Sequence, residues 1–167
     1  LLSRIEAANA EGLNITAQIR GRPTSVLLGF ELSINPFSAC PSWSEVKDLD
    51  FEARIVRLCD PALRARLISE PCGDAIRKRR FQQWDRIFPL GDPPQYEPDP
   101  DTSIAAEAAR QGMSPAELAY DLMLEGAGRT ILYRPTTNYA NGDLAVVHEM
   151  LEHPNTLIGL GDGGAHV

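Results

Sequence analysis

An aspartate among glycines is the residue of this sequence best suited to chemistry. Asp162 follows a nearly all-apolar run, residues 156–161, and lies in the segment 159–164, which contains four glycines. In α/β proteins, functional side chains project from the C-terminal ends of strands, and glycines let a ligand or a metal approach the backbone. Asp162 is therefore a candidate functional residue. The alternative is a structural aspartate that accepts backbone N–H bonds in a tight turn.

The same glycines match the pattern G-x-G-x-x-G, which is typical of a dinucleotide-binding loop. That pattern requires a helix that opens at its third glycine and an acidic residue about 20 positions later. Only three residues follow Gly164. The context therefore disfavours a non-catalytic nucleotide-binding module, which we keep as the alternative function.

The three histidines, His148, His153 and His166, form no H-x-H or H-x-x-x-H pair. His148 and His153 are five positions apart and diverge on a helix, so surface or capping roles are favoured over metal ligation. His166 lies just past Asp162. It is a candidate to line the site, and the alternative is a solvated loop histidine.

The residues around this site predict alternating helices and strands. Near each end of the chain, residues with the apolar spacing of a helix are followed by residues typical of a strand. The expected helices are 1–12, 44–58, 61–68, 75–87, 104–111, 114–126 and 144–152, and the expected strands are 13–19, 130–133 and 156–161. This order is the α/β pattern, and the all-apolar last strand is typical of one buried in a parallel sheet or barrel.

Local signals mark several helix ends. Ser114-Pro115-Ala116-Glu117 is a capping box with proline at the first helical position. Ser44 is a candidate N-cap of the helix 44–58, and either Thr102 or Ser103 can cap the helix 104–111. The acidic, proline-rich residues 92–101 predict an extended surface loop.

Composition restricts the function further. The 167 residues are 43% hydrophobic and carry a net charge of −7, so we expect a globular chain with small-molecule or protein partners and no nucleic acid. No apolar run approaches the length that spans a bilayer, so we expect no membrane association. The cysteines, Cys40, Cys59 and Cys72, are odd in number and lack C-x-x-C spacing. They indicate neither a complete disulfide framework nor a thiolate zinc site, and a reducing cytoplasmic setting is expected.

The segment 153–166, His-Pro-Asn-Thr-Leu-Ile-Gly-Leu-Gly-Asp-Gly-Gly-Ala-His, resembles the eighth-strand motif of the N-acyl-D-amino-acid deacylase group of the amidohydrolase superfamily. Residues 12–17 are similar to that family's approach to strand seven. The stretches 103–109 and 114–124 resemble its helical insertion between strands seven and eight.

The resemblance implies part of a TIM (β/α)8 barrel that hydrolyses an amide bond of an N-acyl (D-)amino acid with one or two zinc ions. It implies that Asp162 binds or orients the metal and its water, takes a proton and passes it to the leaving amine. The family's other metal ligands would all precede Leu1, so we expect a fragment that is inactive by itself. The resemblance also leaves a homo-oligomer possible.

The family's tyrosine-rich substrate segment after strand seven is replaced here by Arg20-Gly21-Arg22-Pro23-Thr24-Ser25. Arginine binds carboxylates with two parallel hydrogen bonds, so Arg20 and Arg22 are candidate substrate ligands; salt bridges on a barrel rim are the alternative. The expected division of the chain is a barrel segment at 1–40, a helical insertion at 41–128 and a second barrel segment at 129–167.

Overall fold

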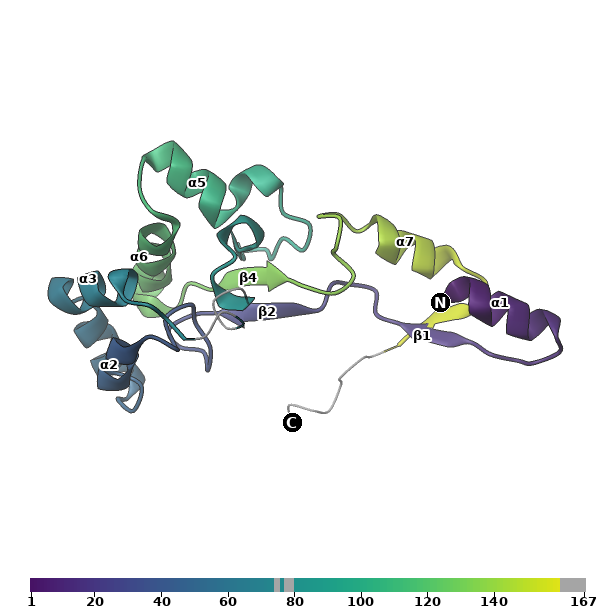
Figure 1. Ribbon diagram of the computed structural model, residues 1–167, viewed down its shortest axis with the longest axis horizontal. Helices are drawn as coiled ribbons and strands as arrows, with labels where there is room; N and C mark the ends of the chain where they lie inside the picture. Colours follow the sequence, from purple (N-terminus) through teal and green to yellow (C-terminus); the bar gives the residue numbers. More distant parts are fainter. Residues whose placement is uncertain (74–75, 77–79, 160–167) are drawn as a thin grey trace. The chain divides into compact units, whose positions relative to one another are not determined.

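The computed structural model describes residues 1–73, 76 and 80–159, which form a mixed α/β protein with two compact units (Figure 1). The central unit is Ser25–Pro135. The terminal unit joins Leu1–Thr24 to Thr136–Val167 and is described as far as Gly159.

The two units meet at 24/25 and 135/136. The boundaries expected between the barrel segments and the insertion are 40/41 and 128/129. Residues 25–28 and 132–135 belong to the central unit because they pair with each other in an antiparallel ladder, with Ser25 opposite Pro135 and Leu28 opposite Leu132. The strand expected at 130–133 is therefore part of the central sheet and lies outside the parallel strand pair.

The terminal unit contains two helices, each followed by a strand. They are α1 (Leu2–Ala10), β1 (Ala17–Ile19), α7 (Ala145–Glu152) and β5 (Thr156–Ile158). β1 is shorter than the expected strand 13–19 for a local reason. The Asn9 side chain donates to Ile15 O at 3.0 Å and accepts from Ile15 N at 2.8 Å, so it takes both backbone groups that a ladder would use.

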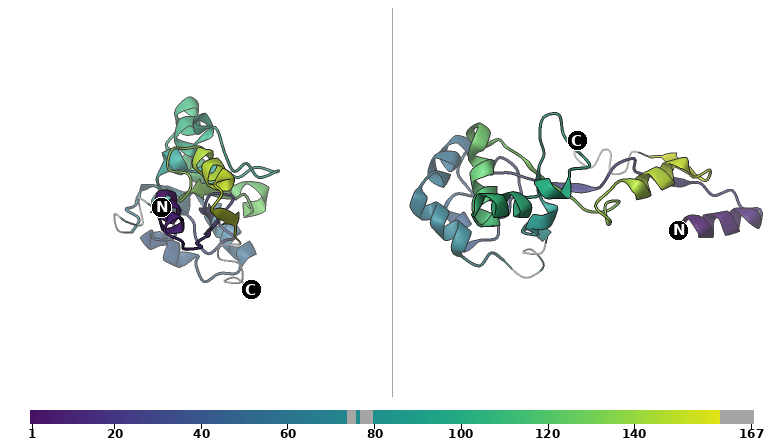
Figure 2. Two further views of the ribbon diagram at one scale, coloured as in Figure 1. Left: turned by 90° about the vertical axis from the view of Figure 1, so that its right-hand side faces the viewer. Right: turned by 90° about the horizontal axis from the view of Figure 1, so that it is seen from above.

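The central unit is built on a three-stranded antiparallel sheet with the order β2-β4-β3. Its strands are β2 (Ser25–Leu28), β3 (Phe88–Pro89) and β4 (Leu132–Pro135). Helices α2, α3 and α6 pack together, and α5 packs against α6 (Figures 1 and 2). The helical bounds are η1 Pro41–Glu45, α2 Phe51–Leu58, α3 Pro61–Ser69, η2 Trp84–Arg86, η3 Pro100–Thr102, α5 Ile104–Gln111 and α6 Pro115–Gly128.

Two expected helices differ from the structure. The helix expected over 44–58 is the short 3₁₀ turn η1 followed by α2, whose N-cap is Asp50 because its carboxylate accepts from Ala53 N at 2.8 Å. Of the helix expected over 75–87, residues 75 and 77–79 lie outside the described part, and 84–86 form η2.

An aromatic cluster forms the middle of the central core. Tyr120 of α6 makes edge-to-face contacts with Phe30 and Phe37, each with ring centroids 5.2 Å apart, and Phe30 stacks on Trp43 at 6.0 Å. The Tyr120 hydroxyl donates to Leu58 O at 2.8 Å and so joins α6 to the end of α2. The side chain is fully buried, and its one polar group is satisfied.

We predict that Tyr120→Phe lowers the free energy of unfolding by about 1–2 kcal/mol near neutral pH, because Leu58 O loses its buried donor. Burial raises the pKa of Tyr120 above its usual value, so the unfolded phenol ionises first. The stabilisation is present below pH of about 10 and is lost as the pH rises above it. Urea unfolding of both proteins across this range checks the prediction. An unchanged difference between them at alkaline pH would contradict the assigned shift.

The Arg54 side chain of α2 donates hydrogen bonds to four backbone carbonyl groups. Its guanidinium donates to Phe30 O at 3.0 Å, Val46 O at 3.3 Å, Lys47 O at 3.2 Å and Leu49 O at 3.1 Å. One half-buried side chain thus supplies donors to three carbonyls of the segment that precedes α2 and to Phe30 O, 24 residues earlier in the chain.

Arg54→Met keeps the apolar stem and removes every one of these donors, and we expect it to lower the free energy of unfolding by about 2–3 kcal/mol. Arg57→Met on the same helix is the matched control. It removes only exposed ion pairs with Glu45 and Asp60, for which we expect a cost below about 1 kcal/mol. Chemical denaturation measures both variants, and equal losses would show that the carbonyl contacts of Arg54 are not stabilising.

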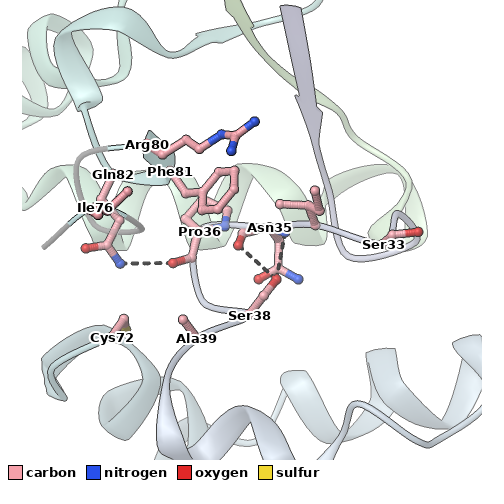
Figure 3. Close-up of a pocket in the computed structure, with 11 residues that line it drawn as sticks. Ser33, Asn35, Pro36, Ser38, Ala39, Cys72, Ile76, Arg80, Phe81 and Gln82 are labelled. Carbon is pink, nitrogen blue, oxygen red and sulfur yellow. Dashed lines mark hydrogen bonds between the residues drawn. The ribbon is translucent and has the colours of Figure 1, made fainter. Parts of the chain in front are cut away.

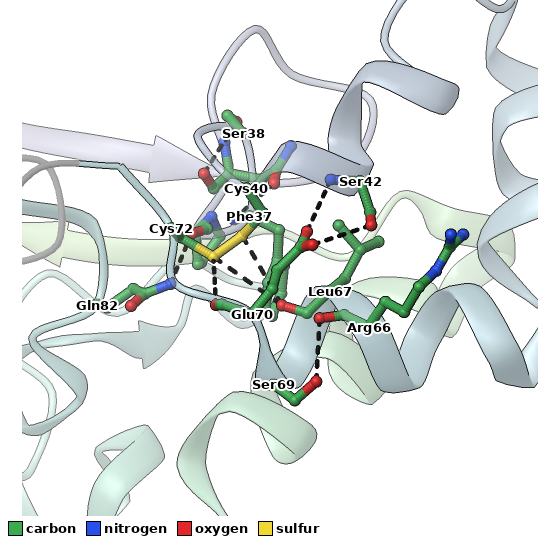
Figure 4. Close-up of a disulfide and its surroundings, with 12 residues drawn as sticks. Phe37, Ser38, Cys40, Ser42, Arg66, Leu67, Ser69, Glu70, Cys72 and Gln82 are labelled. Atoms are coloured by element: carbon green, nitrogen blue, oxygen red, sulfur yellow. Dashed lines mark hydrogen bonds between the residues drawn. A yellow bond between two sulfur atoms is a disulfide. The ribbon is translucent and has the colours of Figure 1, made fainter.

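Cys40 and Cys72 form a disulfide, which the sequence analysis did not expect (Figure 4). Both residues are buried, and they are 32 positions apart in the chain. The number of cysteines is odd because Cys59 is exposed and takes no part in the disulfide. The count alone therefore did not indicate the Cys40–Cys72 pair. Nearby, the Glu70 carboxylate accepts from Ser42 N at 2.8 Å and Ser42 Oγ at 3.0 Å, so the start of η1 is also tied to the residues after α3 by hydrogen bonds.

None of the helices in the described part of the chain has both the length and the apolar character needed to span a bilayer.

Candidate active site

The two strands of the terminal unit pair in parallel and end together. Ala17 lies opposite Thr156, and Ile19 lies opposite Ile158. The ladder continues for one more bond, from Gly159 N to Ile19 O at 2.8 Å. The C-terminal ends of both strands therefore meet at one edge, and the residues that follow each strand start from that edge.

The N-terminal end of β5 is fixed by His153. Its Nδ1 accepts from Asn155 N at 3.2 Å, which leaves the ring proton on Nε2, and Nε2 lies 3.1 Å from the Glu6 carboxylate of α1. His153 O also accepts from Thr156 Oγ1 at 2.9 Å. These contacts are at the opposite end of the strand from Asp162 in the sequence, so the structure gives His153 a positioning role. His148 is exposed and faces Glu152 at 3.5 Å.

Arg20 is the first residue after β1 and belongs to the strand-end edge. It is half-buried, and its Nη1 donates to Thr24 Oγ1 at 2.5 Å. Arg22, two residues on, is exposed. Of the two candidate substrate ligands, Arg20 is the one that the backbone places directly beside the end of β1.

A pocket of about 350 Å³ adjoins this strand in the terminal unit. Arg20 and Glu149 are its two charged lining side chains among the described residues, Gln18 and Asn138 are polar, and the other lining side chains are apolar. Its lining residues are Leu1, Leu2, Ala17, Gln18, Ile19, Arg20, Asn138, Val146, Glu149 and Met150. The volume suits a small molecule, and the arginine gives it one cationic wall.

Gly159 shows why the segment after β5 begins with glycine. A Cβ added there would lie 3.0 Å from Gln18 Cβ and 3.2 Å from Gln18 Oε1, which is closer than ordinary van der Waals contact. The absence of a side chain lets β5 continue beside β1 to the strand ends.

Asp162, the candidate catalytic and metal residue, lies outside the described residues, as does His166. Within 1–73, 76 and 80–159, no three His, Cys, Asp or Glu side chains gather to hold a metal ion. The structure thus brings together the two strand ends and Arg20. The sequence then leads from Gly159 to Asp162 in three residues.

In comparisons with known proteins, no family model, curated protein or solved structure matches the chain.

Proposed function

We propose that this chain is part of a metal-dependent amidohydrolase, in which β1 and β5 are adjacent strands of a TIM barrel. The parallel pairing of β1 with β5 carries the proposal. Each strand follows a helix, and α7 packs against β5, as in a repeated helix–strand unit. Between the two strands the chain forms the central unit, which is the place that the resemblance gives to an insertion.

The exposed apolar residues of β5 support a larger sheet. Leu157 is 47% exposed and Ile158 is 70% exposed. Parallel strands in α/β proteins are normally covered on both faces and continued by neighbouring strands. In the proposed enzyme, further barrel strands cover these side chains and supply the remaining metal ligands.

The proposed reaction is hydrolysis of an N-acyl amino acid at its amide bond. Zinc, when bound with Asp162 among its ligands, would lower the pKa of water and polarise the substrate carbonyl. Asp162 takes a proton from the attacking water, whose oxygen forms the new C–O bond. The C–N bond then breaks, and Asp162 returns the proton to the leaving amine nitrogen. Arg20 and Arg22 bind the substrate carboxylate, and His166 lines the site.

The experiment is zinc removal and restoration in the enzyme in which this chain is joined to the rest of the barrel. Release of free amino acid from N-acetyl-D- and N-acetyl-L-amino acids is measured before chelation, after chelation and after zinc is returned. Zinc-dependent release supports the proposal. Absence of release in every state, together with saturable NAD binding that Gly161→Val abolishes, would overturn it in favour of a nucleotide-binding module.

The two arginines are predicted to differ in their effect on substrate binding. Arg20→Gln removes a charged donor at the end of β1, so we expect KM for an N-acyl amino acid to rise about tenfold while kcat changes little. Arg22→Gln makes an equal change of charge at the second proposed ligand, which is exposed, and its KM is expected to rise less. Steady-state kinetics measure both, and an unchanged KM in Arg20→Gln would contradict the assignment.

A cytoplasmic location and a small-molecule substrate belong to the same proposal. Cytosolic reductants keep most cysteine pairs as thiols, so in that compartment Cys40 and Cys72 would be neighbouring thiols. An oxidising compartment would hold them as the disulfide that the structure shows. A homo-oligomer also remains part of this proposal and is measured by the mass of the assembled enzyme in solution.

A further inference from the structure

The Cys40–Cys72 disulfide joins two segments of the central unit that are also held together by hydrogen bonds (Figure 4). The Glu70 carboxylate, two residues before Cys72, accepts from both the backbone N–H and the hydroxyl of Ser42, two residues after Cys40. These bonds do not depend on the disulfide. The two cysteines therefore stay close to each other when the bond between them opens.

Each sulfur of the pair has a backbone acceptor for the proton that it gains on reduction. Cys40 Sγ lies 3.8 Å from Leu67 O, and Cys72 Sγ lies 3.4 Å from Glu70 O (Figure 4). A thiol is a weak donor, and a free cysteine is otherwise at home in a buried, apolar environment. The fold can therefore hold this pair as two thiols in the places that they occupy as a disulfide.

A pocket of about 500 Å³ in the central unit reaches one member of the pair (Figure 3). Cys72 is among its described lining residues, and Cys40 is not. Exposure does not distinguish the two, because Cys72 is 6% exposed and Cys40 is 4% exposed. Two further lining residues, Gln82 and Pro36, are joined by a hydrogen bond from Gln82 Nε2 to Pro36 O at 2.9 Å, which also does not depend on the disulfide.

The volume of this pocket is in the range of small-molecule sites. Thiol–disulfide exchange requires that an attacking thiol reach one sulfur of the bond and that the other sulfur leave. A small thiol that enters the pocket meets Cys72 before Cys40. The pocket therefore favours attack at Cys72, with Cys40 as the leaving thiol.

We propose that Cys40 and Cys72 form a reversible redox site of the folded chain, which small thiols open at Cys72. The thiolate of the small thiol attacks Cys72 Sγ and forms a new S–S bond, while the Cys40–Cys72 bond breaks and Cys40 Sγ leaves with the electron pair and takes up a proton. A second small thiol attacks the sulfur of the first, which forms a small disulfide and releases Cys72 as a thiol. The cysteine pair is thus reduced and the small thiols are oxidised. A small disulfide reverses both steps.

The test of access compares two variants of the 167-residue chain, both with Cys59→Ala so that each keeps a single cysteine. Cys40→Ser leaves Cys72, and Cys72→Ser leaves Cys40. Each variant is treated with hydroxyethyl disulfide, and the intact mass gives the rate at which the mixed disulfide forms. We expect Cys72 to react about tenfold faster than Cys40 or more, because the pocket gives it access in the folded state.

Repeating both reactions in urea concentrations below the unfolding transition separates access from unfolding. We expect the Cys72 rate to change little, whereas a reaction that requires the unfolded chain accelerates as urea raises its population. Equal rates for the two variants, or a Cys72 rate that rises in step with unfolding, would overturn the proposal.

The test of reversibility equilibrates the ¹⁵N-labelled Cys59→Ala chain with mixtures of glutathione and oxidised glutathione. We expect the same reduced fraction from oxidised and from reduced starting protein, and the dispersed amide resonances of a folded chain in both states. Loss of that dispersion on reduction, or different end points from the two starting states, would contradict a reversible site. These measurements contain no metal and record no turnover, so their failure is distinguishable from a failure of the amidohydrolase proposal.

Discussion

Asp162→Asn is expected to lower kcat for N-acyl amino acid hydrolysis by about 10²–10⁴-fold. Asparagine has nearly the same shape as aspartate but cannot accept a proton from water and return it to the leaving nitrogen. The measurement is the steady-state rate of amine release by the zinc-loaded enzyme that contains this chain. Metal content is determined on the same sample, and we expect most of the zinc to stay bound.

Asp48→Asn provides the matched control for this prediction. It makes the same chemical change at an exposed side chain of the central unit, 86% accessible, and should leave kcat unchanged. Normal turnover in Asp162→Asn would exclude Asp162 as the proton carrier. Loss of zinc in proportion to the loss of turnover would instead reduce its role to metal binding.

Removing the Cys40–Cys72 disulfide is expected to lower the free energy of unfolding by about 3–4 kcal/mol. The bond closes a loop with a sequence separation of 32, and a loop of that length restricts the unfolded chain by this amount in the chain-entropy account. The double variant Cys40→Ala, Cys72→Ala tests this expectation without a reductant. Urea unfolding of the variant and of the oxidised protein gives the difference.

Cys59→Ala is the control for the disulfide, because Cys59 is exposed and free. We expect it to change the free energy of unfolding by less than about 0.5 kcal/mol. Adding a reductant should destabilise the original chain to the level of the double variant and leave the double variant unaffected. A reductant effect of equal size on both proteins would contradict a stabilising bond between Cys40 and Cys72.

Local capping signals were predictable from the sequence. The capping box over Ser114 and Glu117 is present, with Ser114 N donating to Glu117 Oε2 at 2.9 Å, and Ser103 caps α5. Gly112 ends α5 in a left-handed conformation, with φ of 68°. These features depend on neighbouring residues only, so a single sequence contains the information.

The central sheet was not predictable in the same way. β2, β3 and β4 are short, and Phe88 pairs with Tyr133 although 45 residues separate them in the sequence. A strand was predicted at 130–133, which overlaps β4, but a local pattern does not say which distant strands pair with it. Gly29 interrupts the apolar run that contains β2.

The candidate functional features also differ in whether the sequence alone reveals them. Asp162, Arg20 and Arg22 are visible in the sequence because each follows an apolar strand pattern. The Cys40–Cys72 bond instead joins segments that are 32 residues apart in the sequence and approach only in the folded central unit.

The most direct test of the account is the location of zinc in crystals of the zinc-loaded enzyme, found by anomalous scattering at the zinc absorption edge. We expect a zinc ion about 2.0–2.2 Å from an Asp162 carboxylate oxygen, at the shared C-terminal edge of β1 and β5. Zinc at full occupancy elsewhere, with no metal in contact with Asp162, would contradict it.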